Sequence, residues 1–128
     1  MAFTNSTQTP MPTGEKSNFT CELLSAATGT GAGSAFRMHG NYFTFQAYGS
    51  TSAGSGAASI DIEVSNLDSP TAGTSVHWTK AGTISLTLGT TVTNDAFALD
   101  APYLWVRAKV ASISGTDASV NCYMGARG

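Results

Sequence analysis

Charged residues are scarce in this chain, and their scarcity narrows the range of partners. Only 11% of the 128 residues are charged, with 6 Lys and Arg against 8 Asp and Glu and a formal net charge of −2. Proteins that hold a phosphate backbone do so with clustered cations. The composition therefore argues against nucleic acid as a partner.

Long hydrophobic runs are missing as well. The chain has no stretch of 18 apolar residues, so we expect no transmembrane helix and no membrane partner. The opening residues, MAFTNST, have neither the basic region nor the apolar core of a signal peptide. We expect the chain to fold in a cytoplasm.

Residues that carry chemistry are few and scattered. Cys21, His39, His77 and Cys122 lie too far apart in the sequence to form a recognisable zinc motif. The glycine-rich stretch 29–35 matches neither a dinucleotide fingerprint nor a nucleophile elbow. We therefore expect no catalytic, cofactor or metal site, and a protein that is not an enzyme.

The acidic side chains leave two alternatives open. Asp61 and Glu63 share one face of a predicted strand, where a carboxylate pair could act on a sugar as acid and base, but a regular exposed face favours simple solvation. Hydrogen bonding within turns explains the other aspartates, and a Ca²⁺ site built from two such loops is the alternative. These are Asp68, Asp95, Asp100 and Asp117.

Thr, Ser and Gly make up 47 of the 128 residues, a composition that favours strands and turns over helices. Hydrophobic residues recur at every second position, which indicates strands with one buried face. Such runs lie at 18–23, 41–48, 59–66, 75–79, 82–88, 97–99, 103–113 and 120–124. The sequence thus predicts an all-β fold, a single jelly-roll-like antiparallel β-sandwich of about eight strands. Small-residue loops at 26–34 and 49–57 would cross between its sheets.

The end of the chain predicts a hairpin. The run 103–113 places Val106 on the inner face, and the tight connection 114–117 leads directly into the last strand. Cys21 and Cys122 fall at inward positions of the first and last strands. We expect both to be buried free thiols.

The first 16 residues lack this periodicity. Pro10 and Pro12 break any regular element, and Phe3 is the single aromatic residue among them. This segment is either a disordered tail or an arm that becomes ordered on a neighbouring subunit. The predicted organisation is an extended arm at 1–16 and a sandwich domain at 17–128, with Phe3, Pro10 and Pro12 as candidate contact residues.

The outer face of the run 103–113 is the second candidate contact surface. Tyr103, Trp105 and Arg107 combine aromatic rings with a cation, and these residue types dominate interface energetics. We predict an interface with another protein here. Two alternatives remain open: the rings stack on sugars, or Trp105 lies under a covering loop.

Several strand segments, taken in order, resemble small virion structural proteins of tailed bacteriophages, of the kind that decorate or cement capsids. The likeness spans about residues 41–126. It rests on 58–66, Trp78, 82–88, 95–110 and 113–120. The strand 103–109 is also similar to the aromatic-Val-Arg strand of discoidin-like jelly rolls that bind sugars or lipids.

The phage resemblance implies a non-enzymatic, homo-oligomeric protein of the virion, assembled in the host cytoplasm. Its partner would be the major capsid protein, whose lattice it would bind and stabilise, or another virion protein. The alternatives are a head–tail or tail-tip component and a carbohydrate-binding β-sandwich module.

Overall fold

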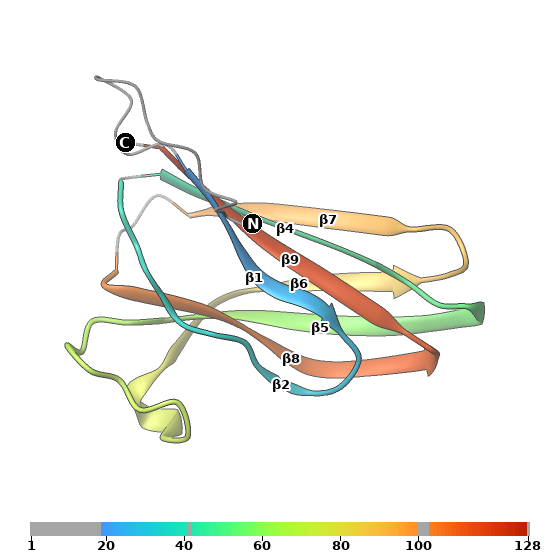
Figure 1. The fold of residues 1–128 in the computed structure, drawn as a ribbon, viewed down its shortest axis with the longest axis horizontal. Helices are drawn as coiled ribbons and strands as arrows, with labels where there is room; N and C mark the ends of the chain where they lie inside the picture. Colours follow the sequence, from blue (N-terminus) through green and yellow to red (C-terminus); the bar gives the residue numbers. More distant parts are fainter. Residues whose placement is uncertain (1–18, 41, 100–102, 128) are drawn as a thin grey trace.

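Two antiparallel sheets face each other in the computed structural model of the chain (Figure 1). The structure describes residues 19–40, 42–99 and 103–127. The first sheet, sheet A, has the strand order β1-β9-β4-β7. Its strands are β1 (Phe19–Ala27), β9 (Ser119–Arg127), β4 (Tyr42–Ser50) and β7 (Thr93–Leu99).

The second sheet, sheet B, has the order β2-β8-β5-β6, and β3 also pairs with β8. Its strands are β2 (Gly31–Ala32), β8 (Trp105–Thr116), β5 (Ala53–Ser65), β6 (Thr79–Leu88) and β3 (Phe36–Arg37). Both β2 and β3 run antiparallel to β8 along the same edge, so they are two pieces of one edge strand.

The order of these strands is that of a jelly roll. The chain changes sheet between consecutive strands with two exceptions: β2 and β3 are pieces of one edge strand, and β5 and β6 are neighbours in sheet B. The first and last strands, β1 and β9, lie side by side in sheet A. The predicted all-β, jelly-roll-like sandwich is confirmed for the described residues, whereas the predicted arm with Phe3, Pro10 and Pro12 lies outside them.

The core lies between the sheets and is built from the period-two rows. Along β4, β6 and β9, and over most of β5, buried apolar residues alternate with more exposed ones. Each of these strands therefore directs one face into the core and the other outward. β-Branched and aromatic side chains fill this space, as expected of pleated surfaces. The largest fully buried side chains include Phe43, Phe45, Ile60, Ile62, Val64, Val106, Val110 and Met124.

The predicted hairpin of the last two strands is wrong. Only Asp117 and Ala118 separate β8 from β9, but β8 belongs to sheet B and β9 to sheet A. Asp117 adopts a φ of 50°, which aspartate tolerates better than most residues. Its carboxylate accepts a 2.8 Å hydrogen bond from the Ser52 hydroxyl, so two turns at this end of the sandwich are tied together.

The predicted crossing loop at 49–57 is also wrong in extent. β4 runs to Ser50 and β5 starts at Ala53, which leaves two residues for the crossing. Backbone pairing explains the difference, because a ladder of hydrogen bonds needs no apolar side chains. At Gly56 a Cβ would collide with the Ser114 carbonyl oxygen of β8, so glycine permits this close approach.

Two further segments differ from expectation. The loop predicted at 26–34 contains the end of β1 and all of β2. The strand predicted at 75–79 is instead a short 3₁₀ turn, η1 (Ser75–His77), and Val76 on it is 86% exposed. In the part of the chain that the structure describes, no helix is long and apolar enough to cross a bilayer.

Both cysteines are free, as predicted, but they differ in burial. Cys122 is fully buried on β9, whereas Cys21 on β1 is only partly buried. Cys21 pairs with Met124 and Cys122 with Leu24, across an irregularity in β1 between Glu22 and Leu24. The two thiols therefore occupy different pairs of the same ladder.

Candidate binding surfaces

The predicted contact residue Arg107 is buried rather than exposed. It lies on the outer face of sheet B, where 5% of its surface remains accessible. Its Nε donates a 2.8 Å hydrogen bond to Glu63 Oε1 in a salt bridge, and its Nη1 donates to the Ala72 carbonyl at 2.9 Å. The guanidinium carbon lies 4.2 Å from the ring centroid of Trp78. We call Glu63, Ala72, Trp78 and Arg107 the Arg107 cluster.

Glu63 and Arg107 lie beneath the β5–β6 loop, residues 66–78, which contributes Ala72 and Trp78 and folds back over the outer face of sheet B (Figure 1). The loop is held by its own hydrogen bonds as well. The Thr71 amide donates to His77 Nδ1 at 2.9 Å, and Trp78 Nε1 donates to the Thr71 carbonyl at 3.2 Å. The β5–β6 loop thus covers the Arg107 guanidinium, which the strand pattern predicted to face solvent.

Trp105 is partly buried and contacts the same loop. Its Nε1 donates to the Asp68 carbonyl at 3.3 Å, and the Arg37 guanidinium lies 5.1 Å from its ring centroid. Tyr103 packs partly buried against the core. The expectation of an exposed Arg107 is thus wrong, whereas Tyr103 and Trp105 are partly exposed and the β5–β6 loop contacts Trp105. A contact of this region with a partner stays a prediction.

The outer face of sheet A presents a different surface, which we call the tyrosine face. Pairing of β4 with β9 sets Gln46 opposite Tyr123 and Tyr48 opposite Asn121. Tyr42 is 62% exposed at one end of this row. The tyrosine face consists of Tyr42, Thr44, Gln46 and Tyr48 on β4 and Asn121 and Tyr123 on β9.

Two rings of the tyrosine face are stacked. Tyr48 and Tyr123 have centroids 6.1 Å apart and ring planes 12° from parallel. The Tyr123 hydroxyl donates a 2.9 Å hydrogen bond to Glu22 Oε2 on β1. The Tyr48 hydroxyl first, and the Glu22 carboxylate second, raise the pKa of Tyr123 well above its usual range. The ring is thus a neutral donor held in a fixed orientation.

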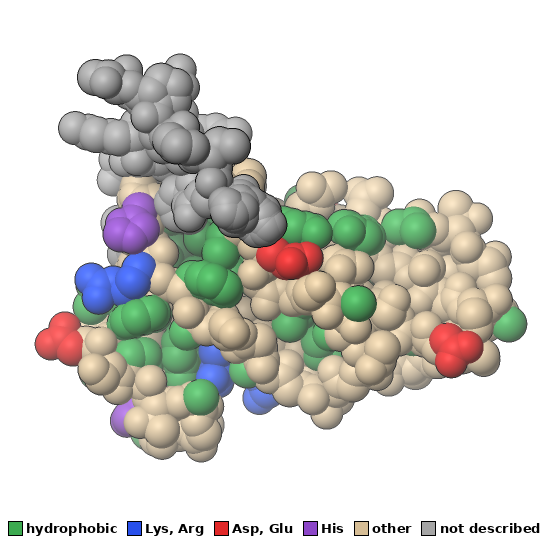
Figure 2. All heavy atoms as spheres, in the orientation of Figure 1, with side chains coloured by type: hydrophobic (Ala, Val, Ile, Leu, Met, Phe, Trp, Pro, Cys, Tyr) green, Lys and Arg blue, Asp and Glu red, His purple; other side chains and the backbone are tan. Residues whose placement is uncertain are grey.

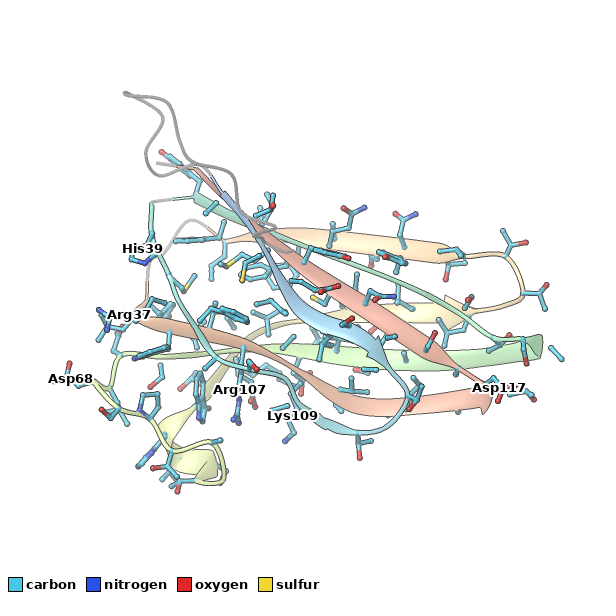
Figure 3. All side chains as sticks on the ribbon, viewed as in Figure 1. Arg37, His39, Asp68, Arg107, Lys109 and Asp117 are labelled. Carbon is cyan, nitrogen blue, oxygen red and sulfur yellow. The ribbon has the colours of Figure 1, made fainter. Side chains whose placement is uncertain are left out.

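The outward positions of β4 and β9 contrast in charge with those of sheet B, although Glu22 on the neighbouring β1 lies beside Tyr123. The outward positions 42–50 of β4 and 119–125 of β9 carry no charged residue. On sheet B, by contrast, Asp61 lies opposite Lys109 and Glu63 opposite Arg107. Figure 3 shows Arg107 and Lys109 on β8 of this sheet, and Figure 2 shows the cations and histidines gathered toward the end that carries the β5–β6 loop.

Four of the carboxylates considered as catalytic or Ca²⁺-binding groups have local partners. Asp61 accepts a 2.8 Å hydrogen bond from the Thr83 hydroxyl, and Glu63 is paired with Arg107. Asp95 caps the Ala96 amide and Asp117 binds Ser52, whereas Asp100 is outside the described residues. Among the described residues, no group of three or more His, Cys, Asp or Glu could hold a metal ion.

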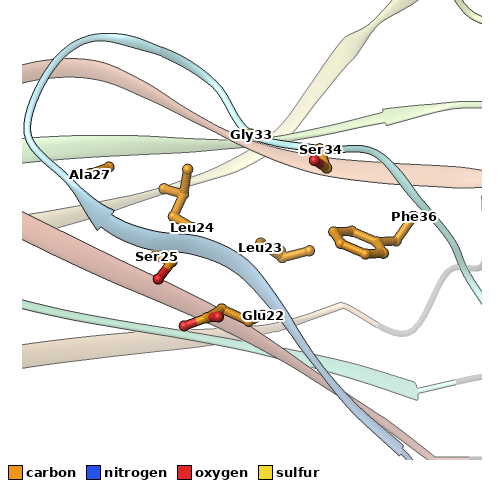
Figure 4. A pocket seen from close by; sticks show the side chains of 8 residues that line it. All are labelled: Glu22, Leu23, Leu24, Ser25, Ala27, Gly33, Ser34 and Phe36. Atoms are coloured by element: carbon orange, nitrogen blue, oxygen red, sulfur yellow. The ribbon is translucent and has the colours of Figure 1, made fainter. Parts of the chain in front are cut away.

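A hollow of about 320 Å³ lies at the open edge of the sandwich, between β1 and the segment that joins β2 to β3. Figure 4 shows the Phe36 ring directed toward Leu23 across it. Glu22 is the one titratable group among its lining residues. At Gly33 a Cβ would collide with the Leu23 carbonyl oxygen, so this segment approaches β1 closely.

The strand pattern predicted a contact surface at Tyr103, Trp105 and Arg107, and it did not predict the tyrosine face. Tyr42 and Tyr48 alternate with the buried Phe43 and Phe45, so their outward direction is readable from the sequence. That Tyr123 lies beside Tyr48 depends on the β4–β9 pairing, which joins segments far apart in the chain. A local pattern carries no signal for such a neighbour.

Comparisons with known proteins add one structural similarity. No family model matches the chain, and no curated protein matches it. A solved structure described as "CBM4 structure and function" is similar at a TM-score of 0.44 and 12% identity, over 87% of this chain and 68% of that one. At this TM-score and identity the similarity does not bear on function.

Proposed function

We propose that this protein is a non-enzymatic virion structural protein that binds a preassembled protein lattice through its tyrosine face, most simply as a capsid decoration or cement protein. The observation that carries the proposal is the uncharged outward surface of β4 and β9, which carries three tyrosines and is bordered by Glu22 on β1. The sequence resemblance to small phage virion proteins implies that the partner is a capsid lattice.

The chemistry of the tyrosine face favours a protein partner. Interface cores are depleted in charge and enriched in aromatic residues, because burying an unpaired charge is costly. Tyrosine adds a large contact area at a small cost in side-chain entropy, and Asn, Ser and Thr add adaptable hydrogen bonds. The stacked Tyr48 and Tyr123 rings are already fixed before binding. Repeated copies on a shell would strengthen weak single contacts through avidity.

A carbohydrate-binding module is the second candidate. Its support is the same parallel pair, Tyr48 and Tyr123, with the Gln46 and Asn121 amides beside it. Aromatic planes offer an apolar surface with a polar edge, and amides bond hydroxyl groups in both directions. A head–tail or tail-tip location would use the tyrosine face in the same way as a capsid location.

A charge placed on the tyrosine face tests the proposal. The probe is the purified virion of the phage whose genome encodes the chain, mixed with the protein and sedimented. Gln46→Lys should lower the bound amount by about tenfold, because the introduced ammonium must be desolvated on contact. Ser85→Lys is the matched control, since Ser85 is also exposed but lies on the outer face of sheet B.

Equal binding of the Gln46→Lys, Ser85→Lys and parent proteins would contradict the proposal. A parent that sediments with an insoluble polysaccharide and not with virions would establish the second candidate instead. The far-ultraviolet spectra of all three proteins should coincide, because both positions face outward.

A further inference from the structure

The β5–β6 loop is longer than its connection requires. β5 and β6 are antiparallel neighbours, which a hairpin of about two to five residues can join. The chain uses residues 66–78 instead. At the opposite end of the sandwich, the crossings from β4 to β5 and from β8 to β9 take two residues each. Loops of this greater length in a domain with otherwise short turns are commonly functional.

Further hydrogen bonds hold the loop along most of its length. Beyond the Arg107 cluster and the Thr71 contacts, the Asn66 carboxamide oxygen accepts from the Leu104 amide at 3.1 Å. The Leu67 amide donates to the Ser65 hydroxyl at 3.2 Å. The His77 amide donates to the Thr74 carbonyl at 3.0 Å, and the Trp78 amide donates to the Ser75 carbonyl at 3.1 Å.

A hydrophobic side chain projects from this fixed loop. Val76 lies on the 3₁₀ turn and is 86% exposed, the highest value among the exposed large hydrophobic residues of the described chain. Its surroundings in sequence, 69–77, contain no acidic or basic residue other than His77. Burying Arg107 to hold this loop has a desolvation cost, and the loop that it holds exposes a valine. A binding role for Val76 would explain why this arrangement is kept.

We propose that the β5–β6 loop is a preformed contact loop that inserts Val76 into an apolar recess of a partner protein, with Arg107 as the residue that positions it. This inference rests on the proposed function, because the partner is a subunit of the bound lattice. An uncharged tip with one apolar side chain fits an apolar recess and not a charged surface. A loop ordered before binding also loses less entropy in the complex.

The contact loop and the tyrosine face lie on opposite sides of the sandwich. Arg107 holds the loop against the outer face of sheet B, and Gln46 faces outward from sheet A. One chain can therefore touch two neighbouring subunits at once. Such a bridge joins subunits rather than merely coating them, which is the action of a cement protein.

Val76→Ser tests the contact, with Val92→Ser as the matched control. Val92 is also an exposed valine, at 55%, and lies in the turn after β6 at the opposite end of the sandwich. On the purified virion described above, Val76→Ser should weaken binding about tenfold and Val92→Ser by less than about twofold. Equal affinities for both variants and the parent would overturn the contact loop.

The double variant Glu63→Gln/Arg107→Met tests the positioning role without leaving an unpaired buried charge. Hydrogen exchange of the Thr71, His77 and Trp78 amides should speed up in a domain whose β-strand amides stay protected. Adding Val76→Ser to this variant should weaken binding no further, because the loop no longer presents residue 76. Full additivity would show that Arg107 acts apart from the loop and overturn its positioning role.

These outcomes separate the two proposals. If Gln46→Lys lowers binding about tenfold while Val76→Ser leaves it unchanged, the contact loop fails and the lattice-binding function stands. If the parent itself does not bind virions, the proposed function fails and the contact loop fails with it.

Discussion

At the scale of single residues, burial decides what a titratable group can do. Burial raises the pKa of the Cys122 thiol to about 12, and burial together with the Glu22 carboxylate raises that of Cys21 to about 11, from an ordinary value of 9.0. Arg107 is also buried, but it remains paired with Glu63. The thiols therefore stay protonated in the folded protein under conditions where they would ionise in the unfolded chain.

The stability of the protein should accordingly fall in alkaline solution. The unfolded chain releases thiol protons above about pH 9 while the folded chain keeps them, so stability present below that pH is lost between about pH 9 and 12. The urea midpoint should be lower at about pH 10.5 than at about pH 8. Cys21→Ala/Cys122→Ala should show a smaller decrease, and an identical decrease would contradict this account.

At the scale of strands, one residue in two contributes to the core. Ile62 is fully buried and Leu86 is 4% exposed, while Ser85 and Thr87 on the neighbouring positions of β6 face outward. These rows belong to β5 and β6, which pair directly. Packing energy in this molecule is therefore concentrated at alternate positions.

Truncation along these strands should show the same alternation. Ile62→Ala and Leu86→Ala should each lower the free energy of unfolding by about 2–5 kcal/mol, from lost apolar burial and the cavity left behind. Ser85→Ala and Thr87→Ala should change it by no more than about 0.5 kcal/mol. Urea unfolding measures all four variants, and similar losses at both pairs would mean that the inward and outward faces are misassigned.

The same alternation explains which features were predictable from the sequence. The inward rows of β4, β5 and β6 follow from local period two, and the structure confirms them. The sheet change between β8 and β9 does not follow from this period. The sequence of a two-residue turn is similar whether the chain folds back within one sheet or crosses to the other. The burial of Arg107 depends on contacts with residues 72 and 78, which no pattern along β8 reveals.

At the scale of the whole molecule, the sheets are held by pairings between distant segments. β1 pairs with β9, β4 with β9, and β5 with β8. Loop-closure entropy must be lost before such non-local pairs form. The topology therefore opposes rapid folding, although the individual strands are regular.

Refolding should be slow for a chain of this size, on the order of milliseconds to seconds. Stopped-flow dilution from urea, followed by Trp fluorescence, measures the rate. Trp78 and Trp105 lie on the same side of sheet B, so their signal reports closure of the β5–β6 loop over β8. Completion within about a hundred microseconds would be inconsistent with a transition state limited by non-local strand pairing.

The position of β9 has a consequence for the synthesis of the protein. This strand lies between β1 and β4 and is translated after every other strand of the sandwich. Until it emerges from the ribosome, β1 and β4 have no partner on their facing edges, and the stretch that supplies Asn121 and Tyr123 does not exist. A chain whose translation stops before Ser119 therefore lacks two of the six residues of the tyrosine face. An unfinished chain would therefore lack both the complete fold and the complete tyrosine face.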